Sequence, residues 1–193
     1  MDVFEAIRTR RSLKPEHLLT DPVERAKIEQ VLEAANWAPS HGLTEPWRFI
    51  VFQGDARKKL VATVVATMVE DGQPPLPDGD PRRTSVEQKM LRAPVTIAII
   101  CAGSSSPKIV EHEEIISTGI AVQNLHLAAT AIGLGGYWTS GKKAFHPKMA
   151  AFLGLAPPAR CLGFFYLGHP KGPSPAGARK PWQDKVSWVE SAE

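Results

Sequence analysis

The sequence predicts a single domain of α+β or α/β class, and three features support that prediction. Residues 93–101 and 160–168 are almost continuously apolar, as expected for strands buried on both faces. Segments with helical spacing of apolar residues and capping residues alternate with them. The chain has 193 residues, enough for one compact core, and no internal repeat divides it. We therefore expect three or four strands and five or six helices.

Two capping patterns predict the first two helices. Asp2, with Glu5 three positions later, resembles a capping box and begins a short helix that carries a basic stretch at its C-terminal end. Asp21 before Pro22 combines a favoured N-cap with proline at the first helical position. The helix that they begin must end before Pro39, because the residue preceding a proline avoids the helical conformation.

A strand is expected over 47–52, and a helix over 55–70 follows it. Residues 71–83 contain four prolines and two glycines, so they are expected to be irregular. Thr84 is the expected cap of the next helix, which reaches about residue 92.

The second half of the chain is dominated by a long helix expected over 111–132. Its apolar residues surround most of the helix, which indicates burial in a core or against a second subunit. Residues 134–141 follow it, and a short helix over 146–154 precedes the strand at 160–168.

The segment 169–193 is expected to be an extended C-terminal arm. Its first part is rich in proline and glycine, whereas Trp182, Val186 and Trp188 make its end apolar. An apolar end after a long extended stretch needs a surface to pack on, and we expect that surface to belong to another chain.

The composition excludes several classes of protein. A formal charge of +3 is too small to indicate nucleic acid as a partner. Cys101 and Cys161 lie in apolar runs and are expected to be buried thiols in a reducing compartment. The sequence has neither a CxxC nor an HExxH pattern, so no metal site is expected. No apolar run approaches the ~20 residues of a membrane helix, and the N-terminus does not resemble a signal peptide. We expect a cytoplasmic protein.

The basic stretch holds Arg8, Arg10, Arg11, Ser12 and Lys14 within seven residues. Guanidinium groups bind phosphate oxygens through two parallel hydrogen bonds, and Lys adds a point charge. The stretch therefore indicates an anion site, although a solvated basic face is the simpler alternative.

Two loops hold further candidates. His41 and Glu45 lie in the loop before the first strand, where either could instead be solvated. Gly135 and Gly136 remove two side chains where the backbone could approach a flat ligand. The alternative is that these glycines mark a bulge at the start of a strand.

In this order the motifs resemble those of the FMN-dependent nitroreductase family, most of all its small, single-domain branch. The resemblance extends over nearly the whole chain, 1–193. It rests on four motifs, which are Arg10-Arg11-Ser12-Leu13-Lys14, Ala38-Pro39-Ser40 through Glu45-Pro46-Trp47-Arg48-Phe49, Gly135-Gly136-Tyr137-Trp138-Thr139-Ser140, and Leu167-Gly168-His169-Pro170 with Arg179-Lys180-Pro181-Trp182.

The resemblance implies an α+β fold with a mixed β-sheet, helices on both sides, and an intertwined homodimer with FMN at the interface. It implies that Arg10, Arg11 and Ser12 hold the phosphate and ribityl chain, together with Arg179. Lys14 would lie near the N1 and O2 edge of the flavin and tune it electrostatically.

By the same resemblance, Tyr137, Trp138 and Thr139 would line the flavin from one chain. His41 and Glu45 would reach it from the partner chain. Many family members have Asn in place of Leu43 and Gln in place of Glu45.

The function that this implies is an oxidoreductase that takes hydride from NAD(P)H and reduces nitro compounds, quinones or a similar small acceptor by a ping-pong mechanism. FMN would carry the chemistry, so no catalytic side chain is expected. The absence of a GxGxxG motif argues against a separate dinucleotide-binding domain. The alternatives are a specialised flavin enzyme of the same fold, such as a dehalogenase or enoyl-type reductase, or a non-enzymatic module that binds an anion or nucleotide.

Overall fold

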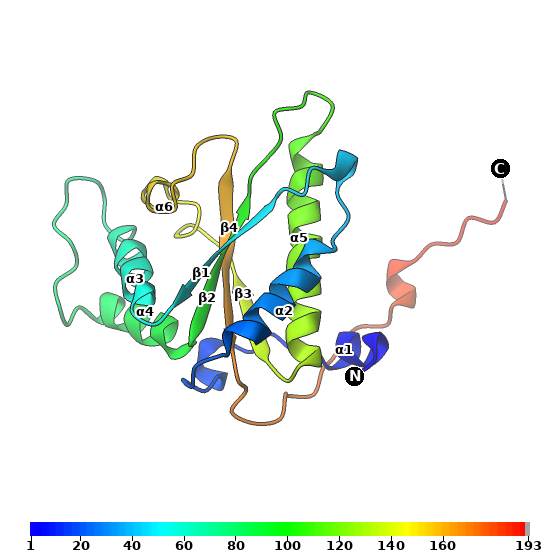
Figure 1. Ribbon diagram of the computed structural model, residues 1–193, viewed down its shortest axis with the longest axis horizontal. Helices are drawn as coiled ribbons and strands as arrows, with labels where there is room; N and C mark the ends of the chain where they lie inside the picture. Colours follow the sequence, from blue (N-terminus) through cyan, green and yellow to red (C-terminus); the bar gives the residue numbers. More distant parts are fainter. Residues whose placement is uncertain (192–193) are drawn as a thin grey trace.

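A computed structural model describes residues 1–191 and places one four-stranded sheet between two groups of helices (Figure 1). The strand order is β1-β2-β4-β3, and every neighbouring pair is antiparallel. The strands are β1 (Trp47–Gln53), β2 (Val95–Cys101), β3 (Gly135–Thr139) and β4 (Arg160–Gly168). A parallel bridge joins Ser12 to Gly136, so the parallel part of the expected mixed sheet is reduced to this contact among the described residues.

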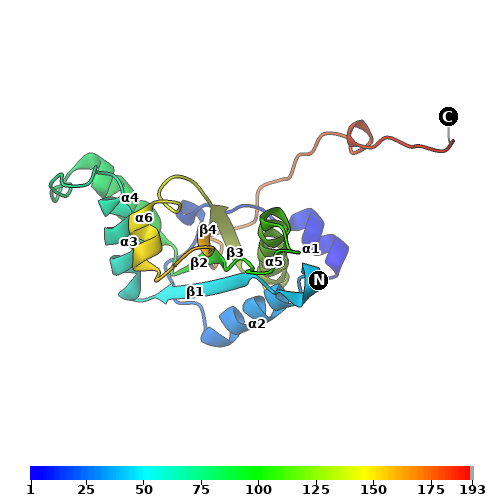
Figure 2. The same cartoon turned by 90° about the horizontal axis from the view of Figure 1, so that it is seen from above.

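Helices cover both faces of the sheet, which confirms the α+β class (Figure 2). On one side lie α1 (Val3–Thr9), α2 (Arg25–Asn36) and α5 (Glu111–Ala131). On the other side lie α3 (Ala56–Ala66), α4 (Pro81–Arg92) and α6 (Pro147–Phe152). Three short 3-10 helices are η1 (Pro15–His17), η2 (His41–Leu43) and η3 (Gln183–Lys185).

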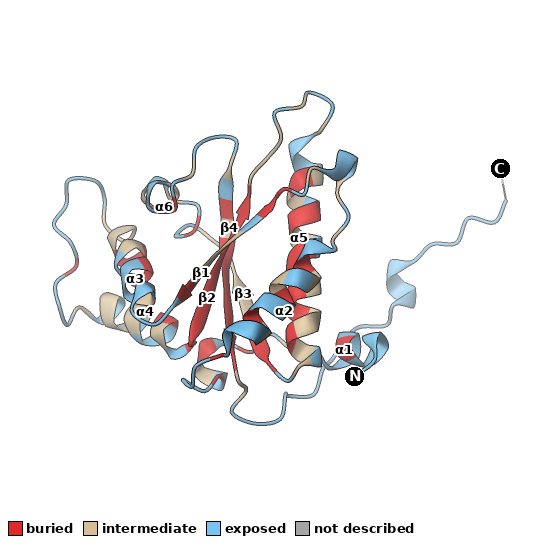
Figure 3. Ribbon diagram, viewed as in Figure 1, coloured by how far each residue is buried: buried red, intermediate tan, exposed pale blue. Residues whose placement is uncertain are grey.

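The core consists of two apolar clusters, one on each face of the sheet. Because side chains alternate along a strand, Phe165 of β4 packs in the cluster under α2 and α5, whereas Phe164 and Tyr166 pack in the cluster under α3. Figure 3 shows the central strands as the most buried part of the molecule. Cys101 and Cys161 are buried free thiols, as expected.

Two helix starts differ from the prediction. The second helix begins at Arg25 rather than after Asp21, because the preceding segment is extended and buries Val23 in the core. The fourth helix begins at Pro81 rather than after Thr84, so the irregular loop ends three residues earlier than expected. Asp80 is its cap and accepts a 2.8 Å hydrogen bond from the Arg82 amide.

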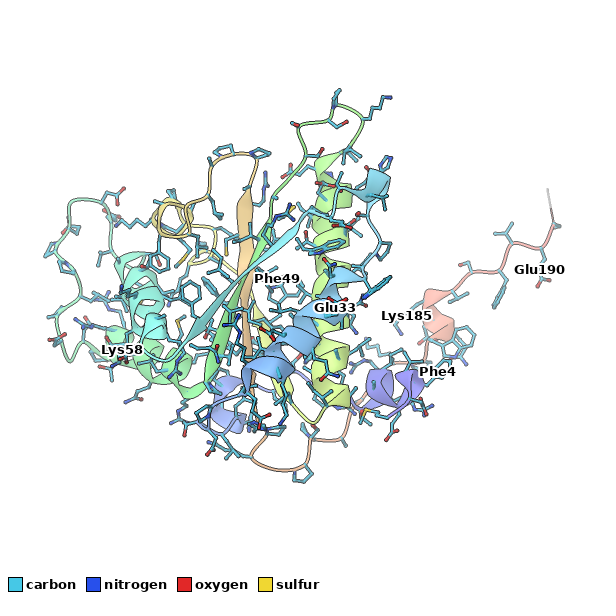
Figure 4. The ribbon with its side chains drawn as sticks, in the orientation of Figure 1. Phe4, Glu33, Phe49, Lys58, Lys185 and Glu190 are labelled. Carbon is cyan, nitrogen blue, oxygen red and sulfur yellow. The ribbon has the colours of Figure 1, made fainter. Side chains whose placement is uncertain are left out.

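The C-terminal arm leaves the body of the protein, and every residue from 171 to 191 is exposed. Figure 4 shows Lys185 and Glu190 on this arm, away from the side chains packed between the sheet and the helices. Trp182 and Trp188 are 58% and 75% exposed. The described part of the arm is therefore mostly irregular with its apolar residues uncovered, and residues 192–193 of the expected arm lie outside the described residues.

Candidate functional site

The cationic side chains of Arg10, Arg11 and Arg179 gather where the N-terminal motif meets the C-terminal arm. Arg10 is the C-cap residue of α1 and is half-buried. Burial lowers the pKa of Arg10, and the charges of Arg179 and Arg11 lower it further. Within residues 1–191 none of the three forms a salt bridge, since no carboxylate lies within 4.0 Å. Uncompensated cations of this kind favour an anion as their counter-charge.

The Arg11 side chain binds backbone oxygens. Its Nε donates to the Pro175 carbonyl at 2.9 Å, and its Nη1 donates to the carbonyls of Arg8 and Arg10 at 2.7 and 2.8 Å. The guanidinium therefore joins the end of α1 to the C-terminal arm. The predicted contact of Arg11 with the phosphate stays a prediction beside this structural role.

Ser12 and Lys14 lie on the exposed side of an extended segment that runs beside β3. The Leu13 amide donates to the Gly136 carbonyl at 2.8 Å, and the Leu13 side chain is buried. The two glycines of β3 allow neighbouring side chains of the protein to pack closely against the strand. A Cβ on Gly135 would lie 2.7 Å from Leu13 Cδ1, and one on Gly136 would lie 2.3 Å from the Phe165 ring. The bulge that was the alternative explanation of these glycines is absent from the β3–β4 pairing.

Beyond Gly136, the outer edge of β3 has no strand partner among the described residues, because β3 is the last strand of the sheet. Its backbone groups over 137–139 are therefore open to hydrogen bonding on that side. The side chains do not all line this surface. Tyr137 stacks on Tyr166 with ring centroids 6.4 Å apart, whereas Trp138 packs in the cluster on the opposite face.

Alternation along the strand separates Trp138 from Tyr137 and Thr139, and the expectation that all three line the flavin stays a prediction. The indole nitrogen of Trp138 is buried and has no hydrogen-bond partner within the described part of the chain.

A hollow of about 330 Å³ lies at the end of β3 and is lined by Thr139. Phe164 and Tyr166 add aromatic side chains to its lining, and Lys89 and Lys143 add two cations. Burial lowers the pKa of Lys143, and the nearby Lys89 charge lowers it further. Burial has the opposite effect on the Tyr166 hydroxyl and raises its pKa, because the charged form of this group is the deprotonated one. Lys89 and Lys143 were not predicted from the sequence, because a lysine on a helix or loop looks the same there as a solvated one.

His126 of α5 supports the basic motif from beneath and was also missed. It is 6% exposed, and its ring meets Phe165 edge-on with centroids 5.0 Å apart. Its Nε2 lies 3.1 Å from the Arg11 carbonyl oxygen, so this nitrogen carries the proton and donates it. Burial, followed by the Arg10 charge, lowers the pKa of His126 from 6.5 to about 4. The ring is therefore neutral at pH 7.

His41 and Glu45 lie at the other end of α5. His41 Nδ1 is 2.8 Å from Glu113 Oε2, in the first turn of the helix. At a rise of 1.5 Å per residue, Glu113 is about 20 Å along α5 from His126. Within one chain, His41 and Glu45 therefore do not join the site that contains the basic motif.

The loop that carries His41 and Glu45 is conformationally unusual. Leu43 and Glu45 have left-handed φ values of 55° and 43°, which residues other than glycine rarely adopt. Thr44 donates to Glu114 Oε1 at 2.6 Å, and this contact holds the loop on α5. Glu114 is buried, and its Oε2 atom has no partner among residues 1–191.

The described residues contain no group of three or more side chains suited to a metal ion. None of their helices is long and apolar enough to cross a membrane.

A family model described as the nitroreductase family matches residues 7–169. The chain belongs to the nitroreductase family. This confirms the resemblance inferred from the four motifs. YdjA of Escherichia coli strain K12, whose name assigns it provisionally to the NAD(P)H nitroreductases, is 29% identical over 172 residues, which cover 89% of this chain and 90% of YdjA.

Solved structures of nitroreductases share the whole fold. A nitroreductase-like family protein from Bacillus cereus superposes with a TM-score of 0.85 at 26% identity, over 99% of this chain and 97% of that one. A provisionally named nitroreductase from Desulfovibrio desulfuricans, solved in complex with FMN, gives a TM-score of 0.75 at 25% identity, over 100% of this chain and 99% of that one.

Proposed function

We propose that this nitroreductase-family chain is an FMN-dependent oxidoreductase that takes hydride from NAD(P)H and reduces a small nitro compound, quinone or similar acceptor. The observation that carries the proposal is the cluster of Arg10, Arg11 and Arg179 beside the open edge of β3. FMN has a phosphate at one end and a planar ring system with polar edges at the other. The FMN in the Desulfovibrio structure and the NAD(P)H in the name of YdjA support this choice.

The residues present fit such a cofactor. Arg10 and Arg179 form no salt bridge among residues 1–191 and can serve the phosphate, and Ser12 and Lys14 are exposed on the segment next to them. Backbone groups of Tyr137 to Thr139 on the open edge would bind polar atoms of the ring. FMN, when bound, supplies the redox chemistry, and the chain binds, orients and tunes it.

We propose further that the working unit is a homodimer. Ile116 is 61% exposed on α5, and the arm presents Trp182 and Trp188 to solvent, so large apolar surfaces are uncovered. Two copies of α5 packed antiparallel would bring His41 of one protomer near the basic motif of its partner. This pairing would explain how residues about 20 Å apart along one helix serve one site.

Light scattering tests the dimer. We expect a dimer both with and without FMN, because obligate interfaces are large and apolar. A stable monomer loaded with FMN would contradict the proposal.

A cytoplasmic location, which the buried thiols Cys101 and Cys161 favour, remains part of the proposal.

Steady-state kinetics tests the activity. FMN-loaded protein would be assayed with NADH or NADPH against a panel of nitroaromatic and quinone acceptors. Ping-pong behaviour, with parallel lines in double-reciprocal plots, is the expected result. FMN binding without oxidation of either nucleotide would favour a specialised flavin enzyme. Failure to bind FMN, combined with binding of other polyanions, would favour an anion-binding module.

A further inference from the structure

The C-terminal arm is attached to the N-terminal motif along its first part. Leu18 bridges Pro170, and the Lys171 amide donates to the His17 carbonyl at 3.0 Å. Lys171 Nζ also donates to the Glu16 carbonyl at 2.8 Å. The arm is thus led past η1 toward the basic motif.

Arg11 makes the next contact, through the hydrogen bond of its Nε to the Pro175 carbonyl. The same guanidinium is held at the end of α1 by the carbonyls of Arg8 and Arg10. One planar fork therefore binds two segments that are 164 residues apart in sequence.

Gly177 passes directly over this guanidinium. A Cβ on Gly177 would lie 2.2 Å from Arg11 Nη2 and 2.4 Å from its Cζ. Gly177 does not have a left-handed φ, so its backbone conformation alone does not require glycine. A methyl group at this position would force the Arg11 guanidinium or the arm to shift, and that guanidinium is held by three hydrogen bonds to backbone carbonyls.

Arg179 follows two residues later. Two residues of extended chain span at most about 7 Å, so the contact at Gly177 restricts Arg179 to the neighbourhood of Arg10 and Arg11. Three like charges would otherwise drive the arm away from the motif. The hydrogen bonds of Arg11 oppose that repulsion before any anion arrives.

We propose that Arg11 and Gly177 form a clasp that holds the segment 173–179 across the anion site and so places Arg179 to bind the phosphate. Arg11 is then a positioning residue, and Arg10 and Arg179 are the phosphate ligands. This inference rests on the proposed function, since the phosphate is that of FMN. Arm closure and FMN binding are therefore coupled. The closed arm binds FMN more tightly than the open arm, and bound FMN favours the closed arm by the same free energy.

Gly177→Ala tests the clasp by adding only the methyl group that Arg11 would meet. Gly172→Ala is the matched control in the same arm, because a Cβ there meets nothing within 4 Å. Arg11→Lys is a second variant that keeps the charge and removes the planar fork. All three leave Arg10 and Arg179 in place, and thermal melting of each variant checks that it is folded.

Two readouts follow the arm and the cofactor separately. Trypsin cleavage after Arg179 in the FMN-free protein reports how often the arm opens. FMN titration reports affinity. We expect Gly177→Ala and Arg11→Lys to be cleaved faster and to bind FMN about tenfold more weakly, the size of one lost hydrogen bond to a charged group. Gly172→Ala should match wild type in both.

Equal FMN affinity in Gly177→Ala and wild type would overturn the clasp, as would equal losses in Gly177→Ala and Gly172→Ala. Weaker FMN binding in Arg11→Lys alone, with unchanged cleavage, would show instead that Arg11 binds the phosphate directly. If wild type does not bind FMN, the proposed function fails, and the cleavage rates still decide whether Arg11 holds the arm.

Discussion

Acidification should destabilise this protein through His126. The folded protein holds the pKa of this ring at about 4, against 6.5 for a free histidine. The unfolded chain therefore takes up the proton more readily, and stability falls as pH drops from 6.5 toward 4. The stability is fully present above pH 6.5, where both states are neutral. For these two pKa values, linkage gives a loss of about 2 kcal/mol between pH 8 and pH 5.

The surroundings of the ring explain the direction of the shift. Phe165 packs against it, and Arg10 is the nearby charge that opposes protonation. The carbonyls of Arg11 and Gly136 act the other way, since they would accept hydrogen bonds from a charged ring. Burial and the Arg10 charge dominate over these two carbonyls.

Urea unfolding of the FMN-free protein at pH 8 and pH 5, at one protein concentration, measures this loss. His126→Gln is the matched variant, because its amide can still donate to the Arg11 carbonyl but does not titrate. We expect wild type to lose about 2 kcal/mol more than His126→Gln over this range. An equal loss in both would refute the reasoning. His126→Leu should cost about 1–3 kcal/mol already at pH 8, because it leaves the carbonyl unpaired.

Four further outcomes are expected. Arg10→Ala and Arg179→Ala should each weaken FMN binding by roughly 1.5–3 kcal/mol, measured by titrating FMN into the deflavinated protein, with an unchanged affinity counting against the site. Lys14→Ala should lower the reduction potential of bound FMN in a redox titration, since a cation near the flavin stabilises the charge gained on reduction. Glu45→Gln should raise that potential and should improve turnover of a carboxylated nitrobenzene relative to a neutral one; an unchanged ratio of kcat/KM values would place Glu45 outside the site. Lys148→Met should lower the free energy of unfolding by about 1 kcal/mol in a urea titration, because its ammonium binds the carbonyls of Ala66 and Val69 at the end of α3.

The sequence predicted the elements well where local chemistry decides them. Asp2 caps α1 by accepting a 2.9 Å hydrogen bond from the Glu5 amide, as its spacing indicates. The same Asp-Pro pattern occurs at 21–22 and at 80–81, yet it begins a helix only at the second place. The first fails because burial of Val23 keeps the chain extended. Nothing local in the sequence separates the two cases.

The site was predictable to the extent that it lies in continuous motifs. Arg10, Ser12 and Lys14 stand together in one stretch, so a basic motif could be recognised from the sequence, whereas the anion site that it suggests stays a prediction. His126 reaches Arg11 across 115 residues, and the neighbourhood of Lys89 and Lys143 is likewise set by the fold. Such contacts leave no local pattern, because a buried histidine on an apolar helix looks like any core residue.

The orientation of side chains is also hard to read from a continuous motif. Trp138 follows Tyr137 directly, and the motif indicated one shared surface. The regular pairing of β3 with β4 instead places the two side chains on opposite faces of the sheet. His41 likewise pairs with Glu113, 72 residues away, because the loop folds back onto the start of α5, and no local pattern marks that contact.

Anaerobic titration of the FMN-loaded protein with NADPH or NADH tests the central claim most directly. The account predicts that the protein binds one FMN per chain and that one equivalent of at least one nucleotide bleaches the flavin absorption completely. The absorption should then return when a nitroaromatic or quinone acceptor is added. A bound flavin that neither nucleotide bleaches, or a folded protein that takes up no FMN, would contradict the account.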